Sequence, residues 1–151
     1  MMPPYSSLQR IRVAESARDL GVVIDSKLSL SAHVAALCRS VSTTCANSAQ
    51  CSDHSAQCSE AARTLVFISN RLDYCNSLLY GLPHSLIHRV QSVQNAAARL
   101  LAGTRRGDHV HISPVLRQLH RLPVQRRVDF KLACFVFSTL SGQAHPYLVD
   151  E

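Results

Sequence analysis

The sequence contains no run of about 18 apolar residues, and without one no helix is expected to cross a bilayer. Its first residues also lack the apolar core and the small-residue cleavage site of a secretory signal. The six cysteines are therefore expected to stay reduced, in an intracellular protein, nuclear or cytoplasmic. Charged residues make up only 17% of the chain against 46% apolar ones, which argues against disorder and for one domain with a hydrophobic core.

The chain also lacks the residue patterns that catalysis and cofactor binding commonly need. It has no glycine-rich phosphate loop, and no two of its seven aspartates are adjacent. Each aspartate is better explained as a helix cap, a turn residue or a surface charge. His109 and His111 lie two residues apart, but the spacing fixes no carboxylate partner for them. We expect no enzymatic activity and no cofactor.

An uneven positive charge is the most informative feature that the sequence does have. The net charge is +6, and the span from His84 to Lys131 holds nine lysine or arginine residues against two acids. A polyanion such as the backbone of RNA or DNA is the natural partner of such a span. A solvated basic face is the alternative.

Hydrophobic periodicity predicts a mainly α-helical chain with a short β-hairpin at its start. Apolar residues alternate over 9–14 and again over 17–25, and Glu15 and Ser16 lie between these two segments. Apolar residues then recur at helical spacing in about five segments. The expected helices run from Ser29 or Ser31 to about Val41, from Ser59 toward Gly81, over 85–103, over 115–120 and over 124–142.

Proline, serine and glycine mark the expected ends of these helices. Pro83 and Pro123 suit a first turn, Ser113 suits a cap, and Gly103 and Gly142 suit the position after a last turn. The residues expected on the inward faces are Leu30, Val34, Leu37, Cys38 and Val41; Ala62, Leu65, Val66, Ser69 and Leu72; Leu86, Val90, Val93, Ala97, Leu100 and Leu101; and Val128, Leu132, Phe135, Val136 and Leu140.

The stretch 42–58 differs from its neighbours because it has no large apolar residue and therefore no face to bury. We expect it to be a mobile, disordered loop. It carries Cys45, Cys51, His54 and Cys58, and three cysteines with a histidine suggest a zinc site. The spacing C-x5-C-x2-H-x3-C contains only one tight pair, so metal binding is the less favoured interpretation.

Four segments, taken in order, resemble one known family. They are LGVVIDSKLSLSAHV, RLDYCNSLLYGLP, RVQSVQNAAARLLAGTRRGDH and SPVLRQLHRLPVQRRVDFKLA. Together they look like the region that follows the palm in reverse transcriptases of LINE-type, non-LTR (jockey-like) retrotransposons. The resemblance covers residues 14–148. It implies a palm-end hairpin remnant at 1–28, then a helical thumb and C-terminal extension at 29–151, as a complete or incomplete bundle.

The family's RNA-directed DNA polymerase activity does not follow from this resemblance. The palm carboxylates that bind two Mg2+ ions, and the endonuclease, belong to parts of the family outside the matched region. A thumb retains a mechanical role, in which basic side chains contact the template-primer backbone without reading its sequence. On that basis the candidate nucleic-acid-binding residues are Arg99, Arg105, Arg106, Arg117, Arg126 and Arg127.

The chain departs from the family in several places, three of which bear on the expected fold. The stretch 42–58 replaces a helix rich in leucine, arginine and tyrosine, and translation in a shifted frame would explain the replacement. Arg121 stands where the family usually has a tryptophan, and loss of that aromatic anchor is expected to cost core packing. The segment around Val66 to Ile68 is about two residues shorter, so its apolar stripe is expected to break there.

Three kinds of function stay open. The first is a thumb remnant without activity. The second is a basic helical module that binds nucleic acid of any sequence. The third is a protein-interaction module in which apolar helix faces, left without a palm, pair with another chain or with a second copy.

Overall fold

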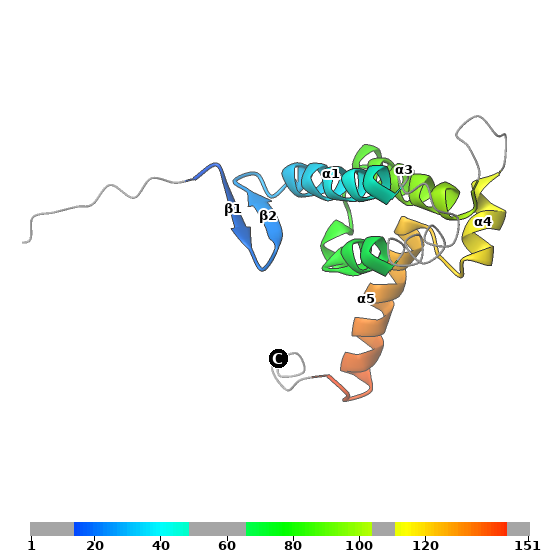
Figure 1. Cartoon of the computed structure of the whole chain (residues 1–151). Coiled ribbons are helices and arrows are strands. Elements are labelled where there is room, and N and C mark those ends of the chain that lie inside the picture. Colours follow the sequence, from blue (N-terminus) through cyan, green and yellow to red (C-terminus); the bar gives the residue numbers. More distant parts are fainter. Residues whose placement is uncertain (1–13, 49–65, 104–110, 145–151) are drawn as a thin grey trace, which may run out of the picture.

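The computed structural model describes residues 14–48, 66–103 and 111–144. Over these ranges the chain is mainly α-helical, with a two-stranded antiparallel hairpin before the helices (Figure 1). This confirms the predicted fold class. The elements are β1 (Ser16–Asp19), β2 (Val22–Asp25), α1 (Ser31–Ser48), a helix at 66–73, the 3-10 turn η1 (Asn76–Leu79), α3 (His84–Leu101), α4 (Ile112–Gln118) and α5 (Val124–Leu140).

The hairpin turns at a different place from the one that the sequence predicts. Asp19 pairs with Val22, so the turn is Leu20–Gly21, inside the segment expected to be one strand. Both turn residues have positive φ, 44° and 84°, as a two-residue type I′ turn requires. The Tyr74 hydroxyl donates a hydrogen bond to the Leu20 carbonyl at 2.5 Å. That contact holds a leucine in a conformation that its side chain disfavours.

Side chains of Asp25 and Ser29 satisfy the backbone at the start of α1. The Asp25 carboxylate accepts from the Leu30 N–H at 3.1 Å and from the Ser29 hydroxyl at 2.6 Å. The Ser29 hydroxyl in turn accepts from the Ser31 N–H at 3.3 Å. The hydrogen bond from Ser29 is the main cause of a pKa of Asp25 below its usual value. The predicted helix start at Ser29 or Ser31 is confirmed.

The expected loop at 42–58 is wrong for its first part, because α1 continues past Val41 to Ser48. The Thr43 and Thr44 hydroxyls donate to the carbonyls four residues earlier, each at 3.0 Å, so these polar side chains are satisfied within the helix. Cys45 packs against the core in place of a larger apolar residue. Burial raises the pKa of its thiol. Residues 49–58 lie outside the described residues.

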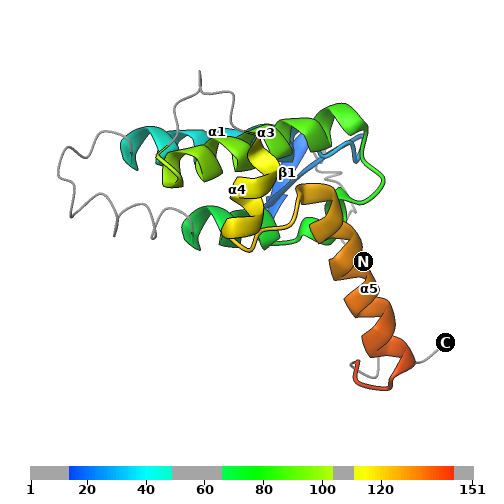
Figure 2. The same ribbon diagram turned by 90° about the vertical axis from the view of Figure 1, so that its right-hand side faces the viewer.

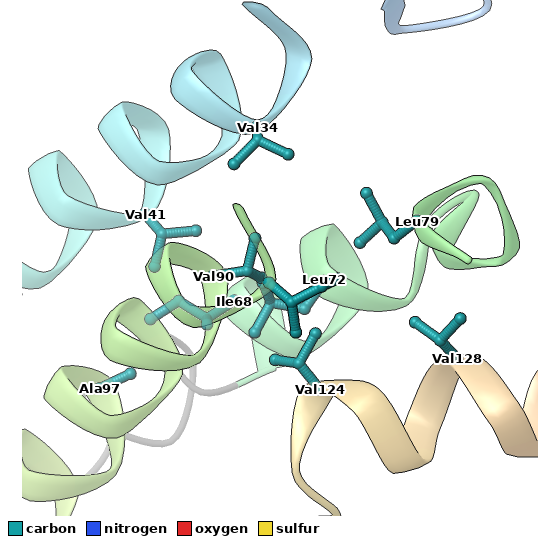
Figure 3. Close-up of a cluster of buried hydrophobic side chains, with 10 residues drawn as sticks. Val34, Val41, Ile68, Leu72, Leu79, Val90, Ala97, Val124 and Val128 are labelled. Atoms are coloured by element: carbon teal, nitrogen blue, oxygen red, sulfur yellow. The ribbon is translucent and has the colours of Figure 1, made fainter. Parts of the chain in front are cut away.

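The main core gathers side chains from α1, the 66–73 helix, η1, α3 and α5 (Figure 3). α1 and α3 lie side by side above it (Figure 1). A smaller cluster joins α3 to α4 through Ala98, Val115 and Leu116. The buried members of the main core are Val34, Val41, Ile68, Leu72, Leu79, Ile87, Val90, Ala97, Val124 and Val128.

Two predicted inward faces need correction. In the 66–73 helix, Val66 is 56% exposed, and Ile68 turns inward with 2% exposed. In α5, Val128 is buried, but Phe135 and Leu140 are 47% and 84% exposed. The first turns of α5 contact η1 and α3, whereas its second half extends away from the other helices (Figures 1 and 2). No described element therefore covers the apolar end of α5.

Prolines precede two helices, and glycines follow their last turns. Pro83 and Pro123 are N-cap residues whose carbonyls accept hydrogen bonds from the first turns of α3 and α5. Gly103 and Gly142 follow the ends of these helices, each with φ of 64°. The expected Ser113 cap is wrong, because α4 already begins at Ile112. Pro114 lies in the first turn of α4, where a backbone nitrogen needs no hydrogen-bond partner within the helix.

The contact between the hairpin and α1 is expected to weaken in acid. The Val23 N–H donates to Nδ1 of His33 at 3.3 Å, which requires an unprotonated Nδ1. Burial lowers the pKa of His33 below its ordinary value of 6.5, and Arg18 lowers it further. Between the lowered pKa of His33 in the folded chain and 6.5, the unfolded chain binds more protons than the folded one. The stability that the neutral His33 contributes is therefore present above about pH 6.5 and is lost as the pH falls.

This prediction is checked by thermal unfolding at several pH values between about 7 and 5. The His33→Asn variant keeps a hydrogen-bond acceptor without a titrating ring, and its unfolding midpoint is expected to fall less than that of the wild type. His88→Asn is the control, since His88 is exposed on α3. Equal pH dependence of the wild type and His33→Asn would contradict the prediction.

Candidate nucleic-acid interface

The turn after α4 fixes the position of a basic corner. The Arg121 N–H donates to the Leu116 carbonyl at 2.8 Å, and the His120 N–H donates to the Arg117 carbonyl at 2.9 Å. These two hydrogen bonds form a Schellman motif, and His120 takes the left-handed position with φ of 51°. The chain reverses at His120 as a result, and Arg121 lies beside α5.

Two glutamines of α3 hold the connection between α4 and α5. Gln94 Nε2 donates to the Leu122 carbonyl at 2.9 Å, and Gln91 Oε1 accepts from the Val124 N–H at 2.8 Å. Gln91 Nε2 also donates to Gln94 Oε1 at 3.0 Å, so the two side chains form one network. Gln91 acts as a cap from another helix, because it accepts an N–H in the first turn of α5 that has no partner within α5.

A cavity of about 400 Å3 opens at this corner. Its lining combines four basic side chains with one acid, one amide and two apolar residues. These residues come from η1 and the end of the preceding helix, from the α4–α5 connection and from the first turns of α5: Asp73, Asn76, His120, Arg121, Leu122, Arg127, Phe130 and Lys131.

Arg127 is a largely buried cation in the lining of this cavity. Its guanidinium donates to the Asp73 carboxylate, and its side chain is only 11% exposed against 46% for Asp73. Burial lowers the pKa of Arg127 and the Asp73 charge raises it, while the nearby Arg121 guanidinium lowers it again. Arg121 and Arg127 therefore repel each other across the corner, and an anion placed between them would relieve the repulsion.

The structure divides the predicted contact residues among different places. Arg127 lines the basic cavity. Arg117 on α4 and Arg126 on α5 are exposed, and both lie within a few residues of the α4–α5 connection in the sequence. Arg99 lines a separate cavity of about 520 Å3 between α1 and α3. Arg105 and Arg106 lie outside the described residues.

The sequence pattern does not single out Arg121, Lys131 and Asn76 as site residues. Arg127 and Lys131 are four residues apart on one helix, a spacing that places them on one face and was available from the sequence. The position of Arg121 depends on a left-handed histidine where glycine is usual, and the sequence gives no signal for it. Arg121 was noted only as a replacement for tryptophan.

The less favoured zinc site receives no structural support from the described ranges. Of its four residues only Cys45 is described, and Cys51, His54 and Cys58 lie outside these ranges. Among the described residues, no three histidine, cysteine or acidic side chains gather as metal ligands would. Within the same ranges, no helix is both apolar and long enough to cross a membrane.

Comparison with protein-family models, with curated proteins and with solved structures finds no match to this chain. The fold and the corner define the class only as a basic, mainly α-helical chain with a leading β-hairpin.

Proposed function

We propose that this chain is a thumb-like remnant of a non-LTR retrotransposon reverse transcriptase, without polymerase activity, that contacts the backbone of RNA or DNA without sequence preference. The order of the four segments supports the family, and a hairpin followed by helices is the fold that the resemblance implies. The observation that carries the binding role is the basic corner between α4 and α5. There, cationic side chains gather around one cavity while a single described carboxylate lines it.

Backbone contact requires exposed charge rather than a shaped base-reading surface. Arg117 on α4 and Arg126 on α5 are exposed, and they flank the connection that carries His120 and Arg121. Each arginine that reaches a phosphate releases a bound counterion, and this release supplies the affinity. The proposed binding is consequently sensitive to salt and indifferent to sequence.

The salt dependence of binding tests this proposal. Replacement of Arg117 and Arg126 together by glutamine is expected to flatten the slope of log affinity against log salt by about 1.4 on single strands to about 1.8 on duplex DNA, at 0.7 to 0.9 per contact. The measurement is fluorescence anisotropy with labelled oligonucleotides of several sequences. Lys27→Gln, an exposed change near the hairpin, is the control and should leave the slope unchanged. An unchanged slope in the double variant, or strong preference for one sequence, would count against the proposal.

The exposed end of α5 favours self-association as a second candidate function. Phe135, Val136, Phe137 and Leu140 are 47%, 57%, 65% and 84% exposed. Together they form an apolar surface on a helix that extends from the bundle (Figure 2). Contiguous apolar surface of this kind commonly marks a protein-protein contact.

The second candidate predicts a mass that rises with concentration. Replacement of Phe137 and Leu140 by glutamate is expected to keep the chain monomeric at concentrations where the wild type dimerises, since charge at a contact costs desolvation. Light scattering measures the mass, and Gln143→Glu, which adds one negative charge at an exposed polar site, is the control. A monomeric wild type at every concentration would eliminate this candidate.

A further inference from the structure

We infer that the cavity between η1, the α4–α5 connection and α5 binds a nucleoside monophosphate unit, either as a free nucleotide or as the phosphorylated end of a strand. The inference rests on the proposed function, because it assigns a specific ligand unit to the corner that would contact nucleic acid. Three features of the lining carry it: unbalanced cations, polar atoms without partners, and an exposed aromatic rim.

The cations around the cavity exceed the described acids. Asp73 balances Arg127, but within the described ranges no carboxylate forms an ion pair with Arg121 or Lys131. Lys131 instead lies over the ring of Phe135, at 5.1 Å from its centroid. The His120 side chain also lines the cavity. A phosphate group has the charge and the several acceptor oxygens that such a lining would bind.

Two polar atoms in the lining have no hydrogen-bond partner. One is a donor, Nε of Arg121, and the other is an acceptor, Oδ1 of Asn76. Asn76 is 5% exposed, and buried polar atoms are nearly always satisfied. Both atoms are buried within the walls, so a ligand reaches them only when the side chains of Arg121 and Asn76 turn toward the cavity, and one that satisfies both must carry an acceptor and a donor. In a nucleotide, a phosphate oxygen accepts from Arg121, and a sugar hydroxyl or a base N–H donates to Asn76.

The rim of the cavity offers a surface for a base. Phe130 and Leu122 line the cavity and are 63% and 50% exposed, although both are large apolar side chains. Bases stack on exposed aromatic rings in proteins that bind single strands. The volume of about 400 Å3 lies within the range of roughly 300–1,000 Å3 typical of small-molecule sites.

The backbone on the cationic side of the cavity is held before any ligand arrives. The Schellman motif holds His120 and Arg121, the hydrogen bond from Gln94 holds Leu122, and the ion pair with Asp73 holds Arg127. A preformed arrangement lowers the entropy that binding must overcome. The cationic side therefore faces the ligand without a change in the backbone.

The test is calorimetric titration of the full chain with adenosine 5′-monophosphate, adenosine and inorganic phosphate. The monophosphate is expected to bind tighter than either fragment. Arg121→Gln should weaken its binding about tenfold or more, because a charged hydrogen bond is lost. Phe130→Ala should weaken the monophosphate about fivefold or more but leave inorganic phosphate unchanged. Arg89→Gln, an exposed change on α3, is the matched control.

Each outcome bears on the inference. Equal affinity for monophosphate and inorganic phosphate would overturn it in favour of a simple anion site, and unchanged binding in a folded Arg121→Gln variant would overturn the location. Should that variant fail to fold by circular dichroism, Phe130→Ala decides, since its side chain is exposed. Tighter binding of a short oligoadenylate with a 5′-phosphate than with a 5′-hydroxyl would support the strand end as the source. Equal binding of the two, with monophosphate bound, would support the free nucleotide.

The proposed function can fail separately. Salt-dependent binding of oligonucleotides with no binding of monophosphate would overturn the inference and leave the proposed function intact. Binding of monophosphate with no binding of oligonucleotides would support the inference for a free nucleotide and overturn the proposed function.

Discussion

Replacement of Ile68 by alanine is expected to lower the free energy of unfolding by about 2–5 kcal/mol. Ile68 is 2% exposed and is among the largest fully buried side chains. In the core it lies among valines from α1, α3 and α5 and leucines from its own helix and η1 (Figure 3). Alanine would leave a cavity that the surrounding helices cannot easily close, so the loss includes missing contacts as well as lost transfer from water.

Urea denaturation followed by circular dichroism measures this loss. Val66→Ala is the matched control, because Val66 belongs to the same helix and is 56% exposed. Its effect is expected to stay within about 0.5 kcal/mol. A small domain has only about 5–15 kcal/mol of stability in total, so Ile68→Ala should move the midpoint far more than the control. Equal midpoints for the two variants would show that Ile68 is not part of a formed core.

The fold class and the central core positions could be predicted from the sequence because they depend on local periodicity. Val34 and Val41 in α1 and Val90 in α3 recur at helical spacing, and all three are buried. Ile68 was not predicted, since Val66 fits the extrapolated stripe equally well and only packing decides between them. The hairpin turn was also missed, because a leucine in the left-handed region has no sequence signal.

The end of α1 and the outward half of α5 could not be predicted, for opposite reasons. Residues 42–48 lack large apolar side chains, yet threonine hydroxyls bonded within the helix and the small side chain of Cys45 allow α1 to continue. α5 has an apolar face along its full length, but its second half extends beyond the described helices. An amphipathic pattern indicates which face of a helix is favourable to bury. It does not indicate which element of the chain covers that face.

The candidate site was partly predictable. Charge density indicates the span that contains α4 and the first turns of α5, and Arg127 is among the predicted contact residues. The cavity itself depends on two contacts between residues far apart in the sequence, Arg127 with Asp73 and Gln94 with Leu122. Such contacts follow from the packing of α5 against η1 and α3, and they have no local pattern.

Replacement of Gln94 by leucine is expected to destabilise the chain by about 1–3 kcal/mol although it adds apolar surface to a buried position. Gln94 is 5% exposed, and its amide donates to the Leu122 carbonyl at 2.9 Å and accepts from Gln91 at 3.0 Å. Leucine has a similar volume but makes neither hydrogen bond. The Leu122 carbonyl then loses this donor, and Gln91 Nε2 keeps only its 2.8 Å hydrogen bond to Asn95.

Chemical denaturation gives the size of the effect, and Gln125→Leu serves as the control because Gln125 is exposed on α5. A double-mutant cycle with Gln91→Leu measures the interaction energy between the two glutamines. Because they share one hydrogen bond, the effects of the two substitutions on the free energy of unfolding should be non-additive by about 0.5 kcal/mol or more. Since Gln94 also holds the connection that carries Arg121, the same substitution is expected to weaken binding of adenosine monophosphate while the chain stays folded. Strictly additive effects with unchanged nucleotide binding would show that the α4–α5 connection keeps its position without the glutamines.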